Sequence, residues 1–289
     1  MKIGITGITG FIGSRVAALA EEHGHEVVGF SRSPKPGMRR ISEDAPPDLT
    51  ELDAVVNLAG ESILGLWTKA KKKRIEVSRV EGTKRIVEAM TAMANPPRVL
   101  VNGSAIGIYG ETGEAIADEY TANGEGFLGE VCQKWEAEAR KAEQAKIRVV
   151  LIRTGLVLGR EGAMKLIRTV FGFGLGGNLG NGKQWMSAIN VEDEAGLILW
   201  AVENEFVTGP VNAVLPEPFR NKEFTRTLAK VMRRLAIFPA PKFAMEMALG
   251  ELSHVLLDSA RVVPRKARED GYLFKYPTLE DALRAALKR

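Results

Sequence analysis

The sequence predicts an α/β fold with a doubly wound parallel sheet and a smaller, mainly helical C-terminal domain. The first ~150 residues alternate short β-branched runs with longer amphipathic segments, as expected when helices cover both faces of a parallel sheet. A glycine-rich turn follows the first run. The rhythm changes after Gly155, so we expect a second, differently built part there.

Five short apolar runs predict strands that are buried on both faces, because such strands are apolar almost throughout. They are Lys2–Thr6, Glu26–Phe30, Ala54–Leu58, Arg98–Asn102 and Arg148–Ile152. Helices are expected to begin near Ile12, and to lie between Thr68 and Met93 and between Glu125 and Lys146. Their lengths suit the crossover connections of a parallel sheet.

The second half of the chain begins with a loop. The stretch Gly172–Gly182 holds six glycines in eleven residues, which excludes a regular element. Beyond it, Ile189–Val202 predicts a short strand followed by a helix, and Gly209–Val214 another strand. The final ~70 residues, from Asn221 onward, are expected to be mainly helical, with turns marked by prolines.

The composition is that of a soluble globular protein. Hydrophobic residues make up 45% and charged residues 26%, and no apolar run approaches the ~20 residues of a membrane span. One cysteine and three histidines predict neither a disulfide nor a metal cluster. With 40 basic and 36 acidic residues, the surface is mixed in sign, so we expect no nucleic-acid partner, no membrane and a cytoplasmic location.

The turn after the first strand has the spacing of a dinucleotide-binding loop. Its glycines are Gly7, Gly10 and Gly13, and it opens the first helix. Glycines at this spacing allow a tight turn, close approach to a pyrophosphate and close helix packing, while the helix N-terminus offers amide donors. We therefore predict a Rossmann-type domain. The loop residues expected to bind the cofactor are Gly7, Thr9, Gly10, Phe11, Ile12 and Gly13.

The end of the second strand indicates which dinucleotide is bound. NAD sites carry an acidic residue there, whereas a 2′-phosphate needs a cation. The run Val27–Phe30 is followed by Ser31 and Arg32, with no carboxylate at the strand end. A guanidinium forms charge-assisted hydrogen bonds with phosphate, so NADP(H) is favoured. The alternative is a merely solvated arginine.

These and further motifs resemble the extended short-chain dehydrogenases/reductases, specifically the atypical NAD(P)-dependent sugar-nucleotide epimerase-like family of the YfcH type. The resemblance runs nearly end to end. Its motifs are Gly7–Gly13, Asn57–Glu61, Ser78–Thr83, Ser104-Ala105 with Tyr109-Gly110, Arg153–Gly159, Gly176-Gly177 with Gln184–Met186, Asn221–Phe224 and Arg261–Pro264.

The resemblance implies further cofactor residues and a division of the chain. It puts Leu58, Ala59 and Gly60 beside the cofactor, directs Arg79 toward it, and puts Arg153 at the carboxyl edge of the sheet. The alternatives are a surface charge for Arg79 and a structural ion pair for Arg153. Residues 1–215 would form the NADP-binding domain, with a substrate-loop insertion at about 160–188, and residues 216–289 a small domain covering the substrate side.

The superfamily's catalytic Tyr-x-x-x-Lys pair is missing. No tyrosine of this chain is followed by lysine four residues later, and the best register puts Leu128 and Cys132 at those positions. Without a neighbouring cation, a phenol keeps a pKa near ~10. Nearby, Glu130 and Lys134 lie four residues apart on one helix face, where they contact the cofactor or, as we favour, pair with each other.

Ser104 matches the superfamily's serine, and Tyr109 is a candidate substitute acid. A packing role for Tyr109 is the alternative, and a buried inert thiol is favoured for Cys132. In the substrate loop, Gln184 and Trp185 offer a hydrogen-bonding group and a stacking surface, or else Trp185 packs on the C-terminal domain.

Two functions remain open at this point. The first is an NADP(H)-dependent oxidoreductase or epimerase with a noncanonical active site, acting on a carbonyl or nucleotide-sugar substrate. The second is a non-catalytic NADP(H)-binding sensor or scaffold. A homodimer through the two long helices is an expectation from the superfamily.

Overall fold

The computed structural model describes residues 1–42 and 44–288, which build a parallel seven-stranded sheet. The strand order is β10-β6-β5-β4-β1-β2-β3, and every neighbouring pair is parallel. The strands are β1 (Lys2–Thr6), β2 (Glu26–Ser31), β3 (Arg39–Arg40), β4 (Ala54–Asn57), β5 (Val99–Ala105), β6 (Arg148–Thr154) and β10 (Gly209–Ala213). This arrangement confirms the predicted doubly wound sheet.

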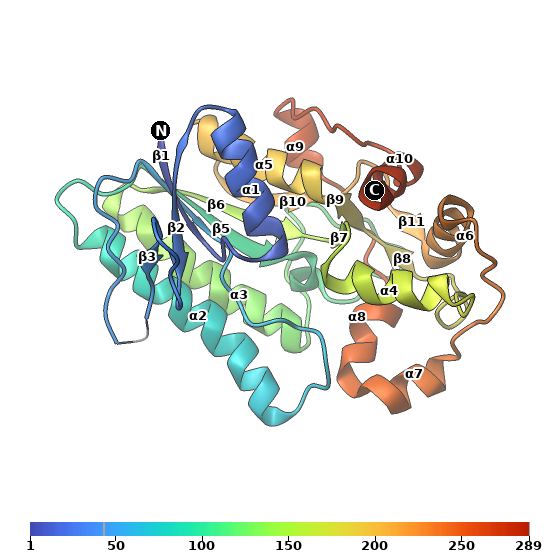
Figure 1. The fold of residues 1–289 in the computed structure, drawn as a ribbon. Coiled ribbons are helices and arrows are strands. Elements are labelled where there is room, and N and C mark those ends of the chain that lie inside the picture. Colours follow the sequence, from blue (N-terminus) through green and yellow to red (C-terminus); the bar gives the residue numbers. More distant parts are fainter. Residues whose placement is uncertain (43, 289) are drawn as a thin grey trace.

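Two pairs of helices cover the two faces of the sheet (Figure 1). Helices α1 (Phe11–Glu22) and α5 (Val191–Glu203) pack together on one face, and α2 (Lys69–Thr91) and α3 (Phe127–Arg140) pack together on the other. All three helices predicted in the first half of the chain are therefore present.

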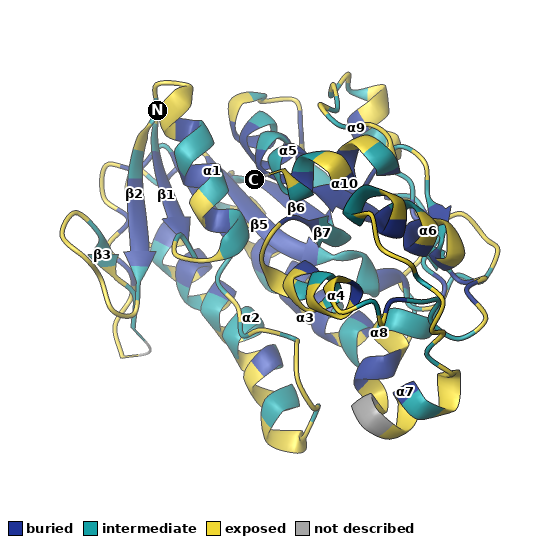
Figure 2. Cartoon of the chain, turned by 45° about the vertical axis from the view of Figure 1, so that its right-hand side comes forward, coloured by how far each residue is buried: buried dark blue, intermediate teal, exposed yellow. Residues whose placement is uncertain are grey.

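Alternating side chains of each strand enter two separate cores, which explains the continuous apolar runs. In β4, Ala54 and Val56 belong to the core shared with α1 and α5, whereas Val55 belongs to the core shared with α2 and α3. Figure 2 shows the buried strands between exposed outer helix faces. The same alternation divides the side chains of β2 between the two faces of the sheet.

Helices α4 (Gly162–Gly172), α6 (Asn221–Met232) and α10 (Leu279–Leu287) gather around a third core at one end of the sheet (Figure 1). Two small sheets pair β7 with β9 and β8 with β11. The remaining elements are β7 (Leu156–Leu158), β8 (Trp185–Met186), β9 (Ala188–Asn190), β11 (Phe219–Arg220), α7 (Lys242–Leu249), α8 (His254–Leu257) and α9 (Arg265–Glu269), with single 3-10 turns η1 (Ile106–Tyr109), η2 (Lys141–Ala145) and η3 (Gly250–Ser253).

The mainly helical C-terminal part is thus confirmed, and residues 173–184 form the expected glycine-rich loop. Three features were not anticipated: the short strand β3, helix α4 inside the 160–188 segment, and the two small sheets. No helix in the described part of the chain is both long and apolar enough to cross a membrane.

Candidate cofactor site

The turn between β1 and α1 is shaped by three glycines. Gly7 has a φ of +69°, and a Cβ on Gly13 would lie 2.3 Å from the Gly7 carbonyl oxygen, so helix and turn approach too closely for any side chain. Gly10 caps α1 without a side-chain hydrogen bond, which leaves the amides of the first turn available. This cradle of free N–H groups, together with the helix dipole, fits a pyrophosphate.

The apolar side chains of the turn pack against the protein. A Cβ on Gly159 would lie 2.1 Å from the Phe11 ring, so this ring covers the chain just after β7. Ile12 packs against the core beneath α1. Thr9 and Gly10 are exposed. Phe11 and Ile12 thus pack on the protein with their half-buried side chains, while their backbone amides belong to the first turn of α1.

The segment after β4 lies against this turn. The Thr6 hydroxyl donates to Asn57 Oδ1 over 2.7 Å and accepts hydrogen bonds from the backbone amides of Leu58 and Ala59, each over 3.2 Å. A Cβ on Gly7 would meet the Leu58 carbonyl oxygen at 2.8 Å. The structure thus brings the two predicted cofactor segments together at the carboxyl edge of the sheet.

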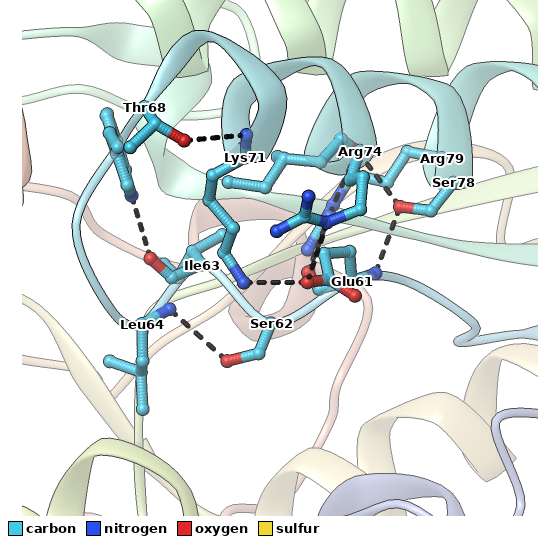
Figure 3. Close-up of polar contacts among 11 residues, drawn as sticks. Glu61, Ser62, Ile63, Leu64, Thr68, Lys71, Arg74, Ser78 and Arg79 are labelled. Carbon is cyan, nitrogen blue, oxygen red and sulfur yellow. Dashed lines mark hydrogen bonds and ion pairs between the residues drawn. The ribbon is translucent and has the colours of Figure 1, made fainter.

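Polar contacts hold the next part of this segment on α2 (Figure 3). The Arg79 guanidinium donates to the Glu61 carbonyl oxygen over 2.9 Å, Lys71 Nζ lies 2.7 Å from the Glu61 carboxylate, and the Glu61 amide donates to Ser78 Oγ over 2.9 Å. Burial lowers the pKa of Arg79. Its guanidinium lies beside Gly60, on the side where the cofactor is predicted.

At the end of β2, the predicted 2′-phosphate residues are accessible. Ser31 is half-buried and its Oγ accepts a hydrogen bond from the Ser33 amide over 3.2 Å. Arg32 is exposed directly after the strand. Their role toward a phosphate stays a prediction.

Ser104, Tyr109 and Arg153 lie together in a buried polar network. The Ser104 hydroxyl donates to Glu136 Oε1 over 2.7 Å, and Arg153 binds both oxygens of Glu136, each over 2.9 Å. Arg153 also donates to the Tyr109 oxygen over 2.9 Å, and the Tyr109 hydroxyl donates to Asn212 Oδ1 over 2.7 Å. Ser104, Tyr109 and Arg153 are only 4–5% exposed.

This network restricts what the three residues can do chemically. A hydroxyl has one proton to donate, and both hydroxyls already donate within the protein. Burial raises the pKa of Tyr109 to about 12, although the charge of Arg153 opposes this shift. The contacts favour the packing alternative for Tyr109 and the ion-pair alternative for Arg153, and any role toward substrate stays a prediction.

Helix α3 carries Leu128 and Cys132, the residues that the predicted register puts at the positions of the missing catalytic pair. Leu128, Cys132 and Glu136 follow one another at four-residue spacing on this helix, so they share a face. Cys132 is 3% exposed, and burial raises its pKa to about 11, which keeps the thiol protonated at neutral pH. The predicted Glu130–Lys134 pair is wrong: Lys134 Nζ contacts Glu76 of the neighbouring helix α2 at 2.5 Å.

The substrate-loop residues Gln184 and Trp185 make internal contacts. The guanidinium groups of Arg220 and Arg261 lie over the Trp185 ring, 3.9 and 4.3 Å from its centroid, and the indole N–H donates to Glu114 over 3.0 Å. Gln184 is 8% exposed and donates to two backbone carbonyl oxygens. The two guanidinium contacts of Trp185 come from the C-terminal part of the chain, which favours the alternative that Trp185 packs on it.

A second buried network escaped sequence analysis. Asn57 Nδ2 donates to Thr83 Oγ1 over 2.8 Å and to Asn102 Oδ1 over 2.7 Å, and the Trp135 indole donates to Thr83 Oγ1 over 2.8 Å. It ties the carboxyl end of β4 and the middle of β5 to α2 and α3. The sequence signals were the motifs that contain Asn57 and Thr83, but no local pattern relates these residues to Asn102 or Trp135.

The strand order, the glycine cradle and the accessible residues after β2 define a Rossmann-fold protein with a dinucleotide-type site. The chain belongs to the NAD dependent epimerase/dehydratase family, which matches residues 3–213, and residues 240–286 match a domain of unknown function named DUF1731. The resemblance to extended short-chain dehydrogenases/reductases is thereby confirmed.

Relatives match over nearly the whole chain. The epimerase family protein YfhF of Bacillus subtilis is 37% identical, with 98% of this chain and 97% of the relative covered. The crystal structure of the human epimerase family protein SDR39U1 with NADPH is 35% identical, with a TM-score of 0.93 and 99% of each chain covered. The predicted NADP(H) cofactor agrees with the NADPH in that structure.

More distant structures share the fold alone. The UDP-glucuronic acid 4-epimerase of Bacillus cereus in complex with NAD is 19% identical, with a TM-score of 0.76, and the match covers 99% of this chain and 95% of that one.

Proposed function

We propose that this protein binds NADP(H) and acts as an oxidoreductase or epimerase on a small carbonyl or nucleotide-sugar substrate. The observation that carries the proposal is the glycine cradle at the start of α1, where a Cβ on Gly13 would lie 2.3 Å from the Gly7 carbonyl oxygen. The free first-turn amides would hold the pyrophosphate, and Ser31 and Arg32 the 2′-phosphate. Family membership and the NADPH-bound human relative support this assignment.

When bound, NADP(H) supplies or accepts a hydride. The backbone of Leu58, Ala59 and Gly60 and the guanidinium of Arg79 would line the site, because they lie at the same carboxyl edge as the cradle. Arg153 would act indirectly, because it holds the Glu136 carboxylate that accepts a hydrogen bond from the Ser104 hydroxyl.

Because the Tyr-x-x-x-Lys pair is missing, the active site of such an enzyme would be noncanonical. Ser104 can orient a substrate oxygen by donation only after its hydroxyl turns away from Glu136. With a pKa of about 12, Tyr109 holds its proton at neutral pH, so its only open role is that of an acid, and donation would require it to leave Asn212. The predicted catalytic roles of both residues therefore depend on rearrangement of the network.

A non-catalytic NADP(H)-binding sensor or scaffold is the second candidate. It is favoured by the same network, because Ser104 and Tyr109 are satisfied internally, and by the sequence register, which predicts Leu128 and Cys132 at the positions of the missing pair. A homodimer through α2 and α3 remains part of the proposal in either case.

Calorimetric titration of cofactor-free protein with NADPH and NADH tests the binding step. We expect tighter binding of NADPH and loss of this preference in Arg32→Ala; absence of binding for both dinucleotides would refute the proposal. NADPH oxidation across aldehydes, ketones, quinones and nucleotide sugars then separates enzyme from sensor. Turnover that disappears in Tyr109→Phe while NADPH affinity persists would assign Tyr109 the acid role.

A further inference from the structure

The short strand β3 brings a second arginine to the carboxyl end of β2. Arg40 pairs with Ser31 in the parallel register, and the Ile41 amide donates to the Ser31 carbonyl oxygen over 3.0 Å. β3 pairs only with the last two residues of β2, so it lies at the edge where the cofactor site is. Neighbouring strands are about 4.8 Å apart, which puts the Arg40 backbone one strand spacing from Ser31.

The two adjacent arginines of β3 are directed to opposite faces. Arg39 pairs with Phe30, whose ring belongs to the core on the side of α2 and α3. The Arg39 guanidinium is engaged there, because it donates to the carbonyl oxygens of Asp48 and Thr50 over 2.9 and 2.8 Å. Side chains alternate along a strand, so Arg40 leaves from the other face.

That other face is the one on which the glycine-rich turn lies. Gly29 and Ser31 share it, two residues apart in β2. A Cβ on Gly29 would meet the Ile8 side chain at 2.8 Å, and Ile8 belongs to the turn between Gly7 and Gly10. The register thus sets Ser31 and Arg40 side by side on the face that the predicted dinucleotide would follow.

We propose that Arg40 is a second specificity-determining cation for the 2′-phosphate of NADP(H), acting together with Ser31 and Arg32. The inference rests on the proposed NADP(H) binding and adds a residue to it. A phosphate monoester carries about −1.5 to −2 charges at neutral pH, which one guanidinium does not balance. Arg40 is exposed, so its side chain can reach a ligand at the surface.

Binding measurements on four proteins test this role without requiring turnover. Wild type, Arg40→Ala, Arg40→Lys and Lys35→Ala are titrated with NADPH, NADH, adenosine 2′,5′-bisphosphate and AMP. Lys35 is the matched control, because it is an exposed cation in the turn before β3. We expect Arg40→Ala to weaken the two 2′-phosphorylated ligands by about tenfold and the others by less than about twofold.

Two further readouts separate recognition from structure. Arg40→Lys keeps the charge and is expected to recover part of the affinity, and added salt is expected to reduce the difference between wild type and Arg40→Ala. Melting temperatures should stay close to that of wild type, because Arg40 is exposed. A variant that melts early and weakens all four ligands equally would contradict the proposal.

The outcomes distinguish this inference from the proposed function. A wild type that prefers NADPH, with Arg40→Ala retaining that preference or losing no more than Lys35→Ala, overturns the role of Arg40 alone. A wild type that binds NADPH and adenosine 2′,5′-bisphosphate no better than NADH and AMP overturns the NADP(H) assignment and this inference with it.

Discussion

Replacement of Arg153 by methionine tests whether this residue serves the fold or the cofactor. Its side chain is 6% exposed and makes three hydrogen bonds, two to Glu136 and one to Tyr109. Arg153→Met replaces the aliphatic stem of the side chain by an unbranched apolar one but leaves the Glu136 carboxylate buried without its cation. Breaking one side of such a pair costs about 3–5 kcal/mol, a large part of the ~5–15 kcal/mol that stabilises a typical domain.

The assay is thermal and denaturant unfolding combined with NADPH titration. At about 2 °C per kcal/mol for a chain of this size, the melting temperature should fall by about 6–10 °C. NADPH affinity measured well below the melting temperature should change little. The double variant Arg153→Met with Glu136→Leu removes both charges and is expected to regain most of the lost stability.

The opposite pattern would refute this reasoning. If Arg153→Met melts within about 2 °C of wild type but loses about tenfold or more in NADPH affinity, Arg153 is a cofactor ligand, as the family resemblance implied. Arg32→Ala is the reference for that pattern, since an exposed arginine after β2 should affect affinity and leave stability unchanged.

Three other perturbations have outcomes that the structure determines. Gly13→Ala puts a methyl group 2.3 Å from the Gly7 carbonyl oxygen, so it should lower the free energy of unfolding by about 1–3 kcal/mol and abolish dinucleotide binding. The control Gly82→Ala in α2, where nothing lies within 4 Å, should stabilise the protein by about 0.5–1 kcal/mol. Equal effects of the two variants on unfolding and on NADPH titration would contradict the predicted role of the Gly7–Gly13 turn. Tyr109→Phe should destabilise by about 1–3 kcal/mol by orphaning Asn212 Oδ1, and unchanged unfolding would remove its structural role. Burial raises the pKa of Glu194 from 4.5 to about 8. Between these pH values the folded state holds a proton that the unfolded state has lost, so the stability of the wild type falls as pH rises through this window. The melting temperature of Glu194→Gln minus that of the wild type should therefore rise across the window, and a difference that does not change with pH would contradict this reasoning.

Much of the fold was predictable because its signals are local. Apolar runs such as Val99–Val101 are buried on both faces of the sheet, and the period of the pattern is enough to recognise them. β3 was missed because Arg39-Arg40 carries no apolar pattern and pairs only at the end of β2. Helix α4 was missed because glycines flank it at both ends.

In the candidate site, too, the residues given by local patterns were predictable and the contacts between distant residues were not. The glycine spacing and the absence of an acid after β2 are properties of short segments, so Gly7, Gly13 and Arg32 could be predicted directly from them. The contacts of Ser104 and Tyr109 were beyond such reasoning, because their partners Glu136 and Asn212 lie 32 and 103 residues away in the chain.

The sequence by itself determined the fold class and the position of the glycine-rich loop, because each depends on backbone freedom or apolar periodicity within a few residues. The cation for the 2′-phosphate is a prediction from the charge of one short segment. Only the tertiary structure decided that Arg153 binds Glu136, that Arg220 and Arg261 cover Trp185, and that Arg40 stands beside Ser31. These pairings depend on strand register and helix packing between distant segments, which bring charges together that no local pattern relates.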